Sequence, residues 1–105
     1  MFDFDYFSKN FLINGEWITF SGAFAKNTKM YRTYSISYSN KYKYTLNVGA
    51  YISYYNGNSF LKTIRLKGPA SMLPYELENV PDADNIYISF DQKYLDKIEL
   101  KRTSQ

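Results

Sequence analysis

The chain has 105 residues, 45% of them hydrophobic and 22% charged, which suits one globular domain, residues 1–105, with a single modest core. It contains no cysteine and no histidine, so disulfides, thiolate metal sites and the standard catalytic triads are excluded. We therefore expect a protein that is not an enzyme, with no cofactor and no metal site.

The first residues, MFDFDYF, carry Asp3 and Asp5 where a secretory signal would carry cations. No apolar run is long enough to cross a bilayer. These features favour a cytoplasmic protein, in its own cell or in a host cell, with no membrane partner. Residues 2–11 combine strand-like alternation with helical spacing of phenylalanines and predict neither element clearly.

From residue 11 onward, β-branched and aromatic residues alternate with polar ones, and turn signals separate the runs. Asn14-Gly15 predicts a tight hairpin, and a short helix is expected near 75–79. Short connections indicate antiparallel hairpins, of which the second joins 31–38 to 42–55 and the last joins 85–90 to 97–102. The expected strands lie within 11–20, 31–38, 42–55, 60–67, 85–90 and 97–102.

The predicted fold class follows from these elements. It is mainly β: a small antiparallel barrel or curled sheet, OB-like or a meander, of about six strands with at most one or two short helices.

Strand parity divides the tyrosines between core and surface. Within 42–54 the even positions form an apolar face, and a bulge at Gly49 would exchange the two faces beyond it. Phe20 and Phe24 are expected to face inward. Five tyrosines are expected to place their rings at the rim of the core, with hydroxyls that reach water or a carbonyl: Tyr34, Tyr38, Tyr42, Tyr44 and Tyr54.

Charge is segregated along the chain although the net charge is only +3. Residues 17–75 hold eight cations and no acid, while all ten acids lie before or after this segment. Codons rich in A and T encode Asn, Lys, Ile and Tyr, so genome composition also explains part of the lysine and tyrosine content. It does not explain why acids are missing from 59 consecutive positions.

The outward positions of the expected strands combine rings and cations on one basic, tyrosine-rich sheet face. Such a face predicts binding of single-stranded nucleic acid, DNA or RNA, because bases stack on rings and cations contact phosphates. The expected stacking residues are Trp17, Tyr31, Tyr51 and Tyr55, and the expected phosphate contacts are Lys41, Lys43, Arg65 and Lys67.

Several alternatives stay open. The same lysines are also typical of sheet faces that avoid pairing with other chains. Tyrosine, tryptophan and arginine are enriched at protein interfaces, so the chain is also compatible with a phage or mobile-element accessory protein. Such a protein would bind and inhibit a host protein, for example a nucleic-acid-binding defence complex. Carbohydrate stacking on Trp17 and Tyr51 is a third possibility, and the oligomeric state is open.

Two acidic motifs do not predict a site. Glu76, Glu78, Asp82 and Asp84 cluster in a proline-containing segment, but clustering alone does not create the geometry of a glycosidase. PDADN at 81–85 resembles the start of a calcium loop, yet Ile86 stands where an oxygen ligand is required.

Overall fold

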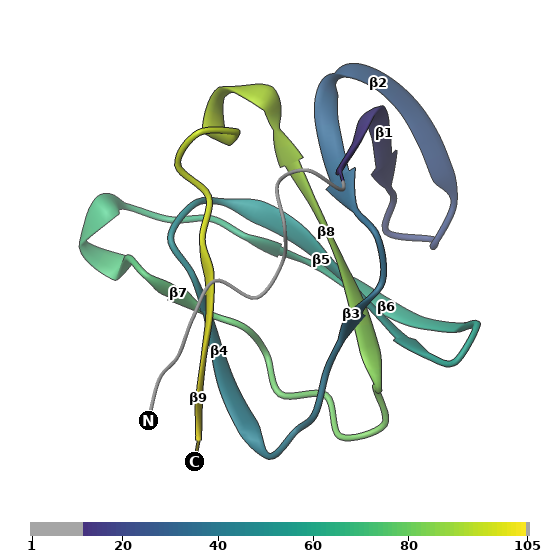
Figure 1. The fold of residues 1–105 in the computed structure, drawn as a ribbon, viewed down its shortest axis with the longest axis vertical. Coiled ribbons are helices and arrows are strands. Elements are labelled where there is room, and N and C mark those ends of the chain that lie inside the picture. The colour runs from purple at the N-terminus through teal and green to yellow at the C-terminus, as the bar shows by residue number, and fades with distance from the viewer. Residues whose placement is uncertain (1–11, 105) are drawn as a thin grey trace.

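The computed structural model describes residues 12–104, which form nine strands and two short 3-10 helices (Figure 1). The helices are η1 (Ala70–Met72) and η2 (Gln92–Tyr94). The strands are β1 (Leu12–Ile18), β2 (Phe24–Thr33), β3 (Ile36–Ser37), β4 (Tyr42–Leu46), β5 (Ala50–Asn56), β6 (Ser59–Leu66), β7 (Tyr75–Glu76), β8 (Asn85–Asp91) and β9 (Leu100–Ser104).

The strands build two antiparallel sheets. The larger has the order β1-β2-β8-β5-β6, with β3 also paired to β8, and the smaller has the order β7-β4-β9. The mainly β prediction is confirmed. Within residues 12–104 the sheets do not close into a barrel, and the finer prediction of an OB-like or meander arrangement is not confirmed.

The core lies between the two sheets and contains the apolar face predicted for 42–54. Leu46, Val48, Ala50 and Ile52 are all at most 6% exposed, even though β4 and β5 belong to different sheets. Residues 47–49 therefore carry the chain from one sheet to the other without changing which side faces inward. No exchange of faces occurs at Gly49.

Three of the tyrosines predicted at the core rim are buried, and the hydroxyls of Tyr54 and Tyr38 reach the carbonyl of Glu78 as expected. The Tyr54 hydroxyl donates to the carbonyl of Glu78 at 2.7 Å, Tyr38 accepts from the backbone N–H of Val80 at 3.0 Å, and Tyr44 accepts from that of Ser39 at 3.1 Å. Burial raises the pKa of the Tyr54 phenol far above its ordinary value, so the buried group is neutral.

Tyr34 does not belong to this group. It is 55% exposed and lies between β2 and β3, where the strand pattern is interrupted, so the prediction of a core position is wrong. Tyr42 is half-buried and packs against the core.

The predicted hairpins are only partly correct. The one between 31–38 and 42–55 is wrong, because β3 pairs with β8 whereas β4 pairs with β7 and β9. β5 and β6 pair across a turn at Gly57-Asn58, as expected. Asn14-Gly15 is not a turn but an irregularity inside β1, where Gly15 takes a φ of 86°. The sequence signal for a positive φ was correct, but it marks a register shift within a strand and not a hairpin turn. The β1–β2 connection falls instead at 19–23.

The C-terminal strands differ most from expectation. β8 pairs with β2, β3 and β5 in the larger sheet, whereas β9 pairs with β4 in the smaller one, so the predicted closing hairpin is wrong. The expected helix near 75–79 is also wrong, because Tyr75–Glu76 forms β7 beside β4.

The loop before β8 supports the β5–β6 turn. The Asp84 carboxylate accepts the backbone N–H of Gly57 at 3.0 Å and the side-chain amide of Asn85. These two hydrogen bonds hold the pKa of Asp84 below its ordinary value, and the bond from Gly57 has the larger effect.

In residues 12–104 no helix has the length and apolarity that a membrane crossing requires.

Candidate anion-binding groove

The outer face of the larger sheet is covered by the tip of the β1–β2 hairpin. The register changes abruptly between the pairs Asn14–Tyr31 and Glu16–Lys26, so β2 has unpaired residues that let the hairpin bend. Gly22 in the turn, with a φ of 85°, lies so close to Phe60 that an added Cβ would be 2.6 Å from the ring. The tip therefore reaches across the sheet to β6.

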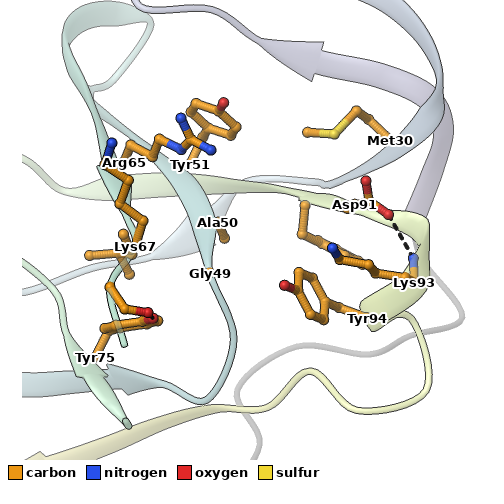
Figure 2. Close-up of a pocket in the computed structure, with 13 residues that line it drawn as sticks. Met30, Gly49, Ala50, Tyr51, Arg65, Lys67, Tyr75, Asp91, Lys93 and Tyr94 are labelled. Atoms are coloured by element: carbon orange, nitrogen blue, oxygen red, sulfur yellow. Dashed lines mark hydrogen bonds between the residues drawn. The ribbon is translucent and has the colours of Figure 1, made fainter. Parts of the chain in front are cut away.

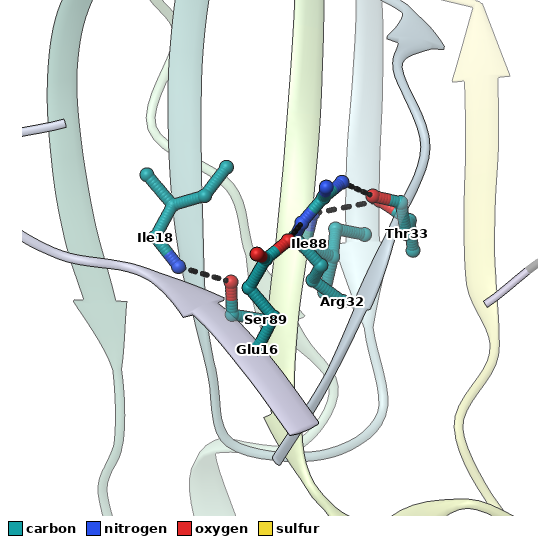
Figure 3. Close-up of polar contacts among 6 residues, drawn as sticks. All are labelled: Glu16, Ile18, Arg32, Thr33, Ile88 and Ser89. Carbon is teal, nitrogen blue, oxygen red and sulfur yellow. Dashed lines mark hydrogen bonds and ion pairs between the residues drawn. The ribbon is translucent and has the colours of Figure 1, made fainter. Parts of the chain in front are cut away.

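Buried hydroxyl groups fasten this tip to the sheet. The backbone N–H of Ile18 donates to Ser89 Oγ at 3.1 Å, and Thr63 Oγ1 donates to the carbonyl of Thr19 at 2.9 Å (Figure 3 shows the Ile18 bond). The hydroxyls of Ser53 and Thr63 are 2.8 Å apart, and all three hydroxyl-bearing residues are at most 8% exposed. This part of the sheet face, which was predicted to be open, is in fact an internal packing surface.

Arg32 on β2 adds further contacts within the β1–β2 hairpin. Its guanidinium pairs with Glu16 and lies 4.6 Å from the centre of the Phe24 ring (Figure 3 shows the ion pair). Thr33 beside it accepts the backbone N–H of Ile88 at 3.0 Å, which ties β2 to β8.

Two predicted stacking residues lie in packed environments. Tyr55 is 7% exposed and its ring touches those of Phe60 and Tyr87, so its expected place on an open face is wrong. Tyr31 stacks on Phe90 with ring centres 6.0 Å apart and packs against the core. Tyr55 is on the expected side of β5 but is covered by neighbouring rings, whereas Tyr31 is on the side of β2 that faces the core, opposite to the side expected.

Two predicted phosphate contacts lie in or next to the other sheet. Lys41 is exposed in the turn before β4, and Lys43 on β4 is 3.7 Å from Glu76 on β7. Lys62 likewise pairs with Glu78. The fold thus brings carboxylates from outside the acid-free segment back to some of its cations, and the eight predicted residues do not form one face.

Three of the eight line a groove of about 300 Å³ (Figure 2), and a fourth lies beside it. Arg65, Lys67 and Tyr51 line it, and Trp17 touches Tyr51 with ring centres 5.0 Å apart. We call this feature the basic groove. Its described lining consists of Met30, Gly49, Ala50, Tyr51, Arg65, Leu66, Lys67, Gly68, Tyr75, Phe90, Asp91, Lys93 and Tyr94.

The cations lie on opposite walls of the basic groove. Figure 2 shows Arg65 and Lys67 on the β5–β6 side and Lys93 on the side of η2. The Arg65 guanidinium lies 5.4 Å from the Tyr51 ring centre, and the Lys93 ammonium 5.2 Å from that of Tyr94. Each wall therefore holds a cation over a tyrosine ring.

The charge balance of the described lining is positive. Three cations against the single carboxylate of Asp91 give a net charge of +2. That carboxylate already accepts the backbone N–H of Lys93 at 2.9 Å, as the cap of η2 (Figure 2). The arrangement suits an anionic ligand.

An exposed ring lies next to the groove. Phe20 is 57% exposed, and its ring centre is 5.7 Å from that of Tyr51. The sequence pattern placed Phe20 and Phe24 in the core. Both predictions are wrong, because the hairpin turn begins just before Phe20 and Phe24, just after the turn, is 48% exposed. Phe20 is thus an accessible stacking surface that parity alone missed.

Lys93, Tyr94 and Tyr75 were also missed. Lys93 and Tyr94 lie in a segment expected only to join two strands, and their place opposite β6 depends on the pairing of β8 with β5. No local signal reports that pairing. The adjacent cation and ring of Lys93 and Tyr94 in QKYLD were the only hint.

Across residues 12–104, no three acidic side chains gather in a way that could hold a metal ion. No family model matches the chain, and the searches of curated proteins and of solved structures found no match.

Proposed function

We propose that this is a non-catalytic protein and that the basic groove binds single-stranded nucleic acid. One observation carries the proposal: two distant segments of the chain, one with Arg65 and Lys67 and one with Lys93, bring three cations to one groove. The groove also contains tyrosine rings and one carboxylate. Lysines distributed evenly over the surface would not place cations on facing walls of one groove.

The groove and its surroundings offer both contacts that single strands use. The three cations can neutralise phosphate oxygens, and Phe20 beside Tyr51 offers an exposed ring for a base. Stacking of a base on an aromatic side chain contributes about 1–3 kcal/mol. A volume of about 300 Å³ accommodates a short part of a strand, and the rest would lie along the hairpin.

The test is a titration of fluorescently labelled oligothymidylate followed by anisotropy at several salt concentrations. Three phosphate contacts predict that log K falls with log salt with a slope of about −2. Absence of binding at low salt would contradict the proposal.

A second candidate function is binding of a host or partner protein, as an inhibitor would bind. It is favoured by the exposure of Phe20 and Phe24, 57% and 48%, on the two sides of the hairpin turn. Hydrogen bonds from the backbone N–H groups of Ser21 and Ala23 to Thr19 Oγ1 hold this turn in shape, so little conformational entropy would be lost on binding. Failure of oligothymidylate to bind would leave this candidate in first place.

A further inference from the structure

We infer that the basic groove recognises a terminal phosphate of the strand, a phosphomonoester, in preference to the phosphodiesters along it. This inference rests on the proposed function and names the part of the ligand that enters the groove. It is carried by how the three cations are arranged around so small a volume.

The charge of the groove matches a terminal phosphate better than a phosphate within the strand. A phosphodiester carries one negative charge, whereas a phosphomonoester carries about 1.5 to 2 at pH 7 and has three strong acceptor oxygens. A site that follows a strand needs cations spaced along its length. Here the cations line opposite walls of a groove whose volume is about 300 Å³, and their net charge together with Asp91 is +2. That charge matches one doubly charged phosphate.

Two of the cations are held in place by tyrosine rings. Arg65 is held over Tyr51 and Lys93 over Tyr94, so both cations lie at the walls before any ligand arrives. A guanidinium donates two parallel hydrogen bonds to phosphate oxygens, while lysine acts as a point charge. Within the part of the chain that the structure describes, Lys67 has no ion-pair partner and is exposed. It is available for the third oxygen.

Binding of a phosphomonoester should depend on pH in a way that binding of a phosphodiester does not. The second ionisation of a phosphomonoester occurs near pH 6. The chain has no histidine, the side chain whose ordinary pKa lies between pH 5 and 8. The ionisable side chains that face the groove are Tyr51, Arg65, Lys67, Tyr75, Asp91, Lys93 and Tyr94. A preference that increases from pH 5 to pH 7.5 therefore reports the second charge of the phosphate.

The experiment compares labelled oligothymidylates of one length that carry a 5′-phosphate, a 3′-phosphate or no terminal phosphate, with the full chain at fixed salt. At pH 7.5 we expect at least one phosphorylated form to bind about tenfold or more tightly than the unphosphorylated one, with the difference falling to about threefold or less at pH 5. The comparison of the two ends shows which terminus enters.

Equal affinity of all three forms at pH 7.5 would overturn the inference while the proposed function stands. Binding of none of them would overturn both. A preference that does not change with pH would also overturn it, because the second charge would then have no part. Lys67→Ala should reduce the preference for the phosphorylated form, whereas Lys41→Ala, an exposed lysine outside the groove, should leave it unchanged.

Discussion

Replacing Lys67 and Lys93 together with alanine is expected to weaken oligothymidylate binding by at least about tenfold. Each side chain faces the basic groove from a different wall, so the double variant removes two of its three cations. A charge-assisted contact contributes about 1.5–3 kcal/mol, and tenfold corresponds to about 1.4 kcal/mol. The salt slope should fall in magnitude by about 1.4, the share of two phosphates. Anisotropy titrations at several salt concentrations measure both quantities.

The matched control is the double variant Lys29→Ala/Lys41→Ala. Both lysines are exposed, lie outside the groove and form no ion pair among residues 12–104, so the net charge changes equally. Its affinity and slope should stay close to those of the wild type. If the two double variants lose affinity to the same extent, binding depends on overall charge and the groove has no special role.

Replacing Ser89 with alanine is expected to lower the free energy of unfolding by about 1–3 kcal/mol. Ser89 Oγ accepts the backbone N–H of Ile18, and both residues are fully buried. The substitution leaves that N–H without a partner in a place that water does not reach, which costs about this amount. Urea denaturation measures the change, and hydrogen exchange at the Ile18 amide should accelerate more than exchange within β5.

Ser37→Ala is the control for this change, because Ser37 is exposed on β3. Its effect should stay within about 0.5 kcal/mol, as is usual for a surface substitution. An equally small effect of Ser89→Ala, with slow exchange at Ile18, would show that the hairpin is held by other contacts and that the hydroxyl contributes little.

The sequence predicted the mainly β class and the inner face of 42–54 because both depend on local alternation. Leu46, Ile52 and Tyr54 are buried as the period of two requires, whichever strand lies beside them. The Gly57-Asn58 turn was equally local. A pattern of this kind says which side faces inward and which residues turn, and in these segments that was sufficient.

Strand pairing could not be predicted in the same way, because it depends on contacts between distant residues. β8 lies between β2 and β5, and β9 joins the other sheet, although only 92–99 separate them. Nothing in the residues of either strand distinguishes this arrangement from a hairpin. The bend of β1–β2 over Ser89 and Thr63 is another such contact, and it turned an expected outer face into a buried one.

The candidate site was predicted in part for the same reason. Tyr51, Arg65 and Lys67 lie together because neighbouring strands of one hairpin carry them, which sequence patterns can indicate. Lys41 and Lys43 were grouped with them because 42–55 was expected to lie in the same sheet, but β4 belongs to the other sheet, where Lys43 lies beside Glu76. Lys93 reaches the groove through the pairing of β8.

The most direct test of the central claim is to map oligothymidylate binding on the uniformly ¹⁵N-labelled protein by amide chemical-shift changes. We expect the largest changes at Arg65–Gly68 and at Lys93 and Tyr94, the two walls of the basic groove, with smaller changes at Tyr51 and Phe20. Changes concentrated around Lys41 and Lys43 on the other sheet, with the groove amides unmoved, would contradict the claim.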